Sequence, residues 1–477
     1  MTLISCTSFE KKKLHHHIKT LASDDFLGRS PMSEGETKTL HYLEGQFNQM
    51  AIKPLLGLKG FRQPVPLASI TTEILGPVSI SGLELSPVKD ISLNSSTLKE
   101  RIELNDIPVI FLGFGIAASE YDWDDYKNVD IKDKIVVTLV NDPGFYKPEY
   151  FRGKNMTYYG RWTYKFEEAK RRGALGALVI HENEAAGYGF HVVSNKSSNL
   201  RINDKGDGLT IQGWLSLDAA KQLFAKTGKN FDENKTAAIN KTGAPIPLGT
   251  LSMRAKNTIS FGNSSNICGY IEGTNTNEYT VISAHWDHLG SKSNEQGGKD
   301  IYRGAIDNGT GVAAIIELAR HFSKHKPARN LLICSFTAEE QGLLGAQYFV
   351  ESPPVPLKSI RGMLNFDCLN VGNEREDIIF YGPEENTLYP LLKEIAAVKK
   401  RVVLKDENAS KGYFYRSDHF PFIQKKVPAL LFMDIGVSNP EYLTKHYHQP
   451  SDAHNPNWKL DGMIADLEFF KLLIERM

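Results

Sequence analysis

Short apolar runs alternate with amphipathic segments from Thr258 to the end of the chain. The runs predict buried strands, and the segments between them predict helices because their apolar residues recur every three or four positions. We expect strands at 279–285, 329–337, 360–370 and 427–436, and helices at 309–325, 342–351 and 388–400. Continuous apolar strands that alternate with helices indicate an α/β fold, with a mainly parallel or mixed sheet covered by helices on both faces.

Two earlier parts of the chain show different patterns. Residues 11–53 repeat apolar positions at helical spacing, with a Gly/Pro/Ser loop in the middle. Residues 64–249 hold one expected helix at 164–173 and short β-like runs at 107–115, 134–140, 173–181 and 209–216. We therefore predict a mostly β domain at 64–249, inserted into a larger domain that consists of residues 1–63 and 250–477.

Length and composition limit the number of domains and the kinds of partner. A chain of 477 residues exceeds the usual size of one domain, which agrees with an insertion. Lys plus Arg and Asp plus Glu number 56 each, so no net field favours nucleic acid or an anionic membrane. No apolar run in the sequence is long enough to span a bilayer. We expect no nucleic-acid partner.

The four cysteines form no CxxC pair, and three of them lie in apolar, strand-like surroundings. Residues Leu3 to Cys6 resemble the lipobox of bacterial lipoprotein signals, although the apolar stretch before Cys6 is shorter than in such signals. Two interpretations stay open: the given start is truncated, or the match is accidental. We expect an extracytoplasmic location, periplasmic or lipoprotein-anchored, with lipid at Cys6 as the only membrane attachment; a cytoplasmic location stays open.

Polar residues gather where the expected strands end, which is where α/β sheets bind ligands. These residues are His285 and Asp287, Asp307, Glu339 and Glu340, Asp367, and His448 beyond the last strand. Each has an ordinary explanation when taken alone; Asp307, for example, could cap the helix that follows it. Together they form an oxygen and nitrogen donor set without thiolate, which suits catalytic zinc.

The number of carboxylates exceeds what one zinc ion uses. Two metal ions about 3.5–4 Å apart would use them all if one carboxylate bridged the pair. Asp307 has the central place in the sequence and is the expected bridge. Of the adjacent glutamates, one would be a ligand and the other a general base.

Five segments, in order, resemble the zinc exopeptidase family of bacterial leucyl aminopeptidases and aminopeptidase Y. They are SAHWDHLG (283–290), GAIDNGTG (304–311), TAEEQGLLG (337–345), NFDCLN (365–370) and YHQPSD (447–452). The segment at 21–36 resembles the N-terminal segment of the family, and the segment at 128–144 resembles its inserted protease-associated domain. The resemblance thus covers most of the chain and implies the zinc exopeptidase fold.

The resemblance implies a role for each polar residue. His285 and Asp367 would bind one zinc ion, Glu340 and His448 a second, and Asp307 would bridge them. Glu339 would be the general base, Asp287 would orient His285, and Tyr447 would stabilise the tetrahedral intermediate. His446 is a rival to His448, but the family spacing to Asp452 selects His448. His288 is not a ligand in the family, and we interpret it as structural.

Two further expectations come from the resemblance. The family typically has a cis peptide after its bridging aspartate, so we expect one between Asp307 and Asn308. The segment RSDHFPF (416–422) matches a family segment near the substrate pocket, which makes Asp418 and His419 secondary candidates.

The resemblance implies an aminopeptidase that removes N-terminal residues from peptide substrates with two Zn²⁺ ions as cofactors. Three alternatives stay open: a glutaminyl-peptide cyclase with one zinc, a glutamate-carboxypeptidase-like enzyme, and a non-catalytic receptor-like homologue.

Overall fold

The computed structural model describes residues 8–55, 57–194, 197–203, 206–243, 245–294, 297–435, 437 and 439–477. The chain forms two compact units. Unit 1 comprises the residues up to 66, 262–406 and 416–477, and unit 2 comprises 67–261 and 407–415. The sequence pattern predicts an insertion at 64–249. In the structure unit 2 begins at 67, its main segment ends at 261, and it includes the short second segment 407–415. That segment has no periodic pattern that would reveal it in the sequence.

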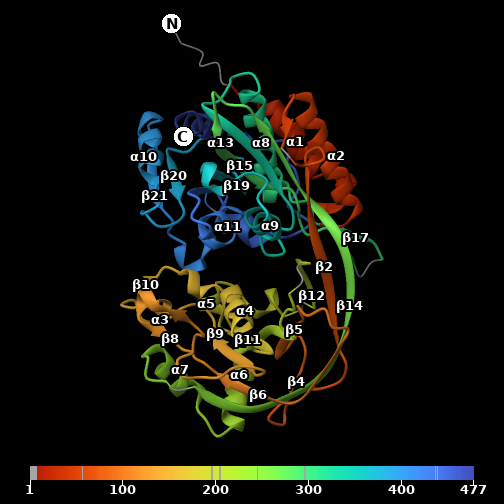
Figure 1. The fold of residues 1–477 in the computed structure, drawn as a ribbon, viewed down its shortest axis with the longest axis vertical. Helices are drawn as coiled ribbons and strands as arrows, with labels where there is room; N and C mark the ends of the chain where they lie inside the picture. Colours follow the sequence, from red (N-terminus) through yellow and green to blue (C-terminus); the bar gives the residue numbers. More distant parts are fainter. Residues whose placement is uncertain are drawn as a thin grey trace. The chain divides into compact units, whose positions relative to one another are not determined.

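Unit 1 is built on the mixed sheet that the apolar runs predict, so the predicted fold is confirmed (Figure 1). Four strands run parallel, in the order β22 (Ala429–Met433), β19 (Ile360–Asp367), β15 (Asn275–His285) and β18 (Arg329–Phe336). The last part of β14 (Ile246–Ile271) pairs antiparallel with β18. The central parts of these parallel strands are mainly apolar because both of their faces are buried there.

Helices cover both faces of this sheet. On β19, Met363 packs in one core cluster with Phe422 of α11 (His419–Gln424) and Phe349 of α9 (Leu344–Glu351). Phe366, three positions later and so on the opposite face, lies 4.6 Å between ring centroids from Phe470 of α13 (Asp461–Arg476). Helix α8 (Gly311–Phe322) contacts β15, β18 and β19 and also packs against α13.

The strand register brings the polar segments together. His285 is the last residue of β15 and pairs with Phe336, the last residue of β18. Asp367 is the last residue of β19. Since β15 lies between β18 and β19, three chain segments that are far apart in sequence end at one edge of the sheet.

The remaining elements of unit 1 complete its surface. The expected N-terminal helices are α1 and α2, and a short 3₁₀ segment separates them where the sequence predicts a Gly/Pro/Ser loop. Helix α13 was not predicted. These elements are α1 (Lys11–Leu21), α2 (Glu34–Gln49), β1 (Lys53–Pro54), β16 (Ser291–Ser293), β17 (Lys299–Ile301), β20 (Asp377–Phe380), α10 (Tyr389–Val398), β21 (Val402–Lys405) and α12 (Pro440–Lys445).

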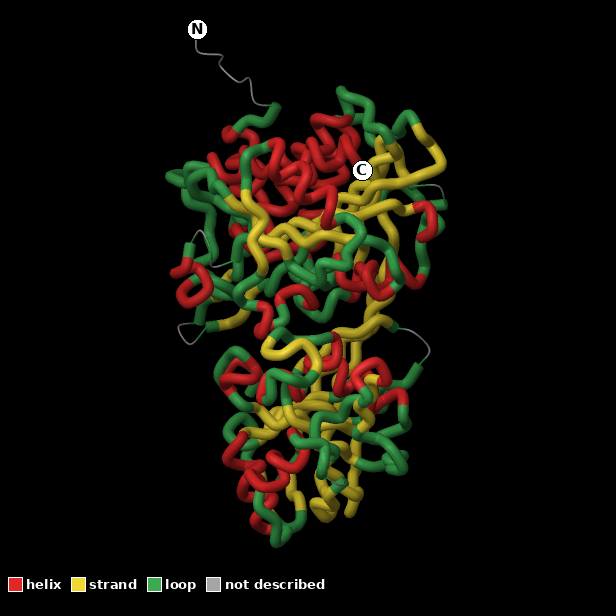
Figure 2. Tube along the Cα trace, turned by 90° about the vertical axis from the view of Figure 1, so that its left-hand side faces the viewer, coloured by secondary structure: helices red, strands yellow, loops and turns green. Residues whose placement is uncertain are grey.

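Unit 2 is rich in strands, as predicted, and also contains helices (Figure 2). Its central strands run in the order β6 (Arg101–Phe111), β9 (Ile135–Leu139), β11 (Gly176–His181), β13 (Ile211–Ser216) and β5 (Ile91–Asn94). The first four are parallel to one another. The expected helix is α4 (Trp162–Arg171), and α6 (Leu217–Lys226) and α7 (Phe231–Ile239) are additional.

The other elements of unit 2 are short, apart from the beginning of β14 and β2 (Arg62–Ile74), which starts in unit 1. They are β3 (Val78–Ile80), β4 (Leu83–Leu85), β7 (Ala117–Ala118), β8 (Trp123–Asp124), α3 (Pro143–Tyr146), β10 (Phe151–Lys154), α5 (Asn183–Ala186) and β12 (Ser198–Ile202).

Two observations concern membranes. Cys6, the expected lipid attachment point, lies outside the described residues. Among the helices that the structure describes, none combines the length and the apolar composition that crossing a bilayer requires.

Candidate metal centre

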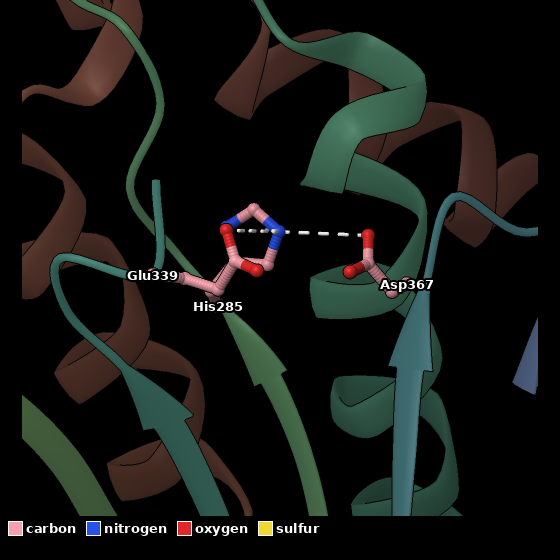
Figure 3. Close-up of side chains that lie close together, drawn as sticks. All are labelled: His285, Glu339 and Asp367. Carbon is pink, nitrogen blue, oxygen red and sulfur yellow. Dashed lines mark ion pairs between the residues drawn. The ribbon is translucent and has the colours of Figure 1, made fainter. Parts of the chain in front are cut away.

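His285 stands at the centre of the first group of site residues. Its Nε2 atom lies 3.3 Å from Oδ1 of Asp307 and 3.5 Å from Oδ1 of Asp367. Glu339 is slightly farther away, with its Oε2 atom 3.9 Å from the same nitrogen (Figure 3). All four side chains are almost completely buried. The other oxygen of Asp367 accepts a 2.7 Å hydrogen bond from Ser417, which leaves Oδ1 facing the imidazole.

His448 stands at the centre of the second group. Its Nε2 atom lies 3.2 Å from Oδ2 of Asp307 and 3.2 Å from Oε2 of Glu340. His446, its rival in the sequence, instead has its Nδ1 atom 2.9 Å from the hydroxyl of Ser451. The structure therefore brings His448, and not His446, next to the carboxylates.

The spacing of these atoms fits zinc. Ligand atoms at about 2.0–2.1 Å from a tetrahedral zinc ion lie about 3.3–3.4 Å from one another. The distances from the two histidine nitrogens to their carboxylate oxygens are 3.2–3.5 Å. Asp307 contributes a different oxygen to each group, so one carboxylate connects two sets of donors. The arrangement can hold two metal ions.

The loop around Asp307 is held from two sides. The peptide bond between Asp307 and Asn308 is cis, which confirms the expectation from the family resemblance. The side chain of Asn308 donates to the carbonyl of Phe366, next to Asp367, over 2.8 Å. Asp452 accepts hydrogen bonds from the backbone N–H groups of Ile306 and Asp307, at 3.0 and 3.1 Å. These contacts hold the backbone of Asp307, and so its carboxylate, in a defined position.

Asp287 holds the backbone of the two glutamates. Its Oδ1 atom accepts a 3.0 Å hydrogen bond from the N–H of Glu339, and its Oδ2 atom lies 3.4 Å from the N–H of Glu340. Nδ1 of His285 is 3.7 Å from this carboxylate and makes its 3.1 Å hydrogen bond with the backbone carbonyl of Asp287 instead. Asp287 thus contacts His285 through its backbone carbonyl, and its carboxylate, to which the sequence interpretation assigned the contact, lies 3.7 Å from the same nitrogen.

The charges of the site act on one another strongly because most of its side chains are buried. Burial raises the pKa of Glu339 well above its usual value, against the opposing effect of His285. Burial acts in the same direction on Asp307, but His285 and His448 outweigh it and hold the pKa of Asp307 well below its usual value. Glu339 therefore holds a proton more readily than the bridging Asp307, as a general base must.

Tyr447 and the two secondary candidates, Asp418 and His419, also have defined places. The ring of Tyr447 stacks on His448 with 3.8 Å between centroids. Asp418 and His419 are completely buried. Neither oxygen of Asp418 has a hydrogen-bond partner among the described residues, and burial raises the pKa of this carboxyl well above its usual value.

His288, interpreted from the sequence as structural, contacts a proposed metal ligand. Its Nδ1 atom lies 2.6 Å from Oε1 of Glu340, and its side chain is buried. With Asp307 and Glu340 it forms a group of donors close enough to hold a metal ion. The position of His288 in SAHWDHLG, three residues after His285, could have indicated a role in the site. The family pattern does not include it among the ligands, so we interpreted it as structural. In the structure His288 holds one oxygen of Glu340 while the other faces His448.

The N-terminal segment supports the loop that carries His285 and Asp287. Leu27, Gly28 and Arg29 have φ values of 50°, 68° and 52°, so three consecutive residues adopt the left-handed conformation. The carbonyls of Gly28 and Arg29 accept hydrogen bonds from the N–H groups of Gly290 and His288, at 2.9 and 3.2 Å. A Cβ atom on Gly28 would lie 2.3 Å from the carbonyl oxygen of Gly290.

Replacing Gly28 by alanine is expected to destabilise unit 1. The Gly28→Ala variant should lose about 2–5 kcal/mol of unfolding free energy, because left-handed strain and overpacking add together. Denaturant titration measures the loss. Gly60→Ala is the matched control: Gly60 has a φ of 75° and open space around it, so strain alone should cost about 1–2 kcal/mol. Equal losses in the two variants would contradict a close fit at Gly28.

Part of the chain is similar to known peptidases. The model of peptidase family M28 matches residues 266–469. A probable zinc metalloprotease of Pyrenophora tritici-repentis is 29% identical over 153 residues, 31% of this chain and 34% of that protein. Leupeptin-inactivating enzyme 1 of Streptomyces exfoliatus is 30% identical over 159 residues, 33% of this chain and 32% of that enzyme. The match thus spans about a third of these relatives.

A solved structure extends the likeness to the whole chain. The aminopeptidase of Aneurinibacillus sp. strain AM-1 superposes with a TM-score of 0.53 at 19% identity. The superposition covers 98% of this chain and 93% of that one. At this level of identity the comparison shows a common fold.

Proposed function

Because residues 266–469 belong to peptidase family M28, we propose that the chain is a zinc-dependent exopeptidase, and specifically an aminopeptidase that releases N-terminal residues from peptides. The observation that carries the proposal is the position of Asp307. One of its oxygens lies 3.3 Å from His285 and the other 3.2 Å from His448. A carboxylate shared in this way is what a two-metal site requires.

We assign the ligands from this geometry. His285 and Asp367 would hold one zinc ion, Glu340 and His448 would hold the other, and Asp307 would bridge them. Bound zinc would supply Lewis acidity, which polarises a peptide carbonyl and lowers the pKa of a nearby water. The carboxylate of Asp287 supports this arrangement by accepting hydrogen bonds from the backbone N–H groups of both glutamates.

Glu339 is assigned as the general base. It is buried beside His285 but farther from it than Asp307 and Asp367, so its carboxylate is free for proton transfer. It accepts a proton from the attacking water and returns it to the departing amine. Tyr447, whose ring stacks on that of His448, would donate a hydrogen bond to the oxyanion of the tetrahedral intermediate.

We also propose that unit 2 is the protease-associated domain that segment 128–144 resembles, since this segment lies within unit 2. The extracytoplasmic location and the lipid at Cys6 stay predictions. Mass spectrometry of the lipid fraction after expression in a bacterial host would test them.

The activity is tested with pairs of peptides that differ only in a free or an acetylated N-terminus. We expect the zinc-loaded protein to shorten the free peptides stepwise and to leave the acetylated ones intact, because an aminopeptidase needs the free α-amino group. Mass spectrometry of the mixture over time measures both.

The other outcomes separate the alternative functions. Loss of C-terminal residues from both forms would indicate a carboxypeptidase, and loss of ammonia from glutamine-led peptides would indicate a cyclase. No change in any peptide would refute the enzyme proposal and leave a receptor-like protein.

A further inference from the structure

Arg29 is the largest charged side chain among the fully buried residues that the structure describes, with 1% of its surface exposed. Its guanidinium donates four hydrogen bonds, and all four acceptors are backbone carbonyls. They belong to Trp286 at 2.8 Å, Leu21 at 2.6 Å, Arg303 at 2.7 Å and Gly304 at 2.8 Å. One side chain therefore joins three separate segments of unit 1.

Two of these segments carry the proposed metal ligands. Trp286 stands between His285 and Asp287, and Gly304 is three residues before the bridging Asp307. The backbone carbonyl of Arg29 also accepts from the N–H of His288, which contacts Glu340. Arg29 thus contacts the chain just after the first histidine, at Trp286 and His288, and just before the shared carboxylate, at Gly304.

The charge of Arg29 has no direct counter-ion. Among the residues that the structure describes, no carboxylate lies within salt-bridge distance of its guanidinium. The carboxylates of Asp452, Asp307, Asp287 and Glu340 nevertheless attract it through the dry interior. An isolated buried cation is costly, so four carbonyl dipoles and the surrounding carboxylates must together balance the lost hydration.

We propose that Arg29 is a positioning residue of the metal centre: it joins the loop of His285 to the loop of Asp307 and so sets the distance between the ligands. The proposal rests on the metal site proposed above. It adds a residue more than 250 positions before the first ligand, from the segment at 21–36, to which the sequence interpretation gave no role in the site.

The hydrogen bonds and the positive charge of Arg29 have opposite effects on zinc affinity. A measurement of zinc affinity therefore tests the proposal. A cation near bound zinc repels it, so loss of the charge alone would strengthen metal binding. Loss of the four hydrogen bonds would let the two loops separate and would weaken binding. Residues that orient metal ligands typically contribute about 10–100-fold to metal affinity.

The test measures metal binding without turnover. Zinc affinity is determined for the full-length protein by competition with a chromophoric chelator, and the coordination geometry is read from the absorption bands of bound Co²⁺. Arg29→Gln should bind zinc about 10–100-fold more weakly and change the Co²⁺ spectrum. Arg29→Lys keeps the charge but cannot reach all four carbonyls, so its affinity should also fall.

Arg401→Gln is the matched control. Arg401 is also buried in unit 1, where it donates to the carbonyl of Asp377 and to Asp466, and it contacts no site residue. This variant should lose stability and keep the zinc affinity and Co²⁺ spectrum of the wild type.

Unchanged or tighter zinc binding in Arg29→Gln would overturn the proposal, even if stability fell as in Arg401→Gln. If Arg29→Gln does not fold, Arg29→Lys decides: wild-type affinity overturns the proposal and weaker binding supports it. A wild-type protein that binds no zinc would instead refute the metal site itself.

Discussion

Replacing Glu339 by glutamine should abolish most turnover and leave both metal ions in place. Glutamine has nearly the same shape, so the buried pocket beside His285 stays filled, but its amide cannot accept the proton of the attacking water. General bases typically contribute 10²–10⁴-fold to a rate, and kcat should fall by about that factor. The measurements are kcat on a free peptide and the zinc content of the purified variant.

The neighbouring glutamate provides the control. Glu340→Gln should lose zinc, because Oε2 of Glu340 lies 3.2 Å from His448 among the donors of the second group. The two adjacent variants therefore separate catalysis from metal binding. Wild-type turnover in Glu339→Gln would remove this residue from the role of base.

Replacing Asp307 by alanine should empty the site of metal, since this residue contributes an oxygen to each group of donors. Free zinc at 100 times its dissociation constant stabilises a folded protein by about 2.7 kcal/mol per site. We expect the wild type to show a zinc-dependent rise in its unfolding midpoint and Asp307→Ala to show almost none. Elemental analysis after gel filtration gives the stoichiometry directly.

Asp461→Ala is the control for this variant. Asp461 begins α13 and pairs with Lys11 at the surface, so its loss should leave the zinc content unchanged. Asp307→Ala that retains two zinc ions would contradict the bridging assignment. Retention of one ion would show that the two groups of donors fill independently.

The periodicity of unit 1 was sufficient to predict its fold. Strands such as 279–285 are mainly apolar because both of their faces are buried, and this pattern is local. Helix α13 was not predicted, although Phe469, Phe470 and Leu473 are buried along it at helical spacing. The second segment of unit 2, 407–415, has no such pattern and was not predictable.

The candidate site was predictable to the level of residue type. Imidazoles and carboxylates at the ends of apolar strands are costly unless they bind something, so their presence alone pointed to a metal. The contacts of His288 and Asp287 could not be predicted from the sequence. Their side chains lie against Glu340 and the backbone of Glu339, contacts that depend on how two loops meet and that spacing in the chain does not encode.

The sequence by itself determined the α/β fold of unit 1, the set of donors and the order in which the chain presents them, because periodicity and side-chain chemistry are properties of short segments. Only the tertiary structure decided which oxygen of Asp307 faces which histidine, and that Arg29 joins the two loops from far away in the chain. Such relations are distances between atoms of separate elements, and they arise only when the sheet brings its strand ends to one edge.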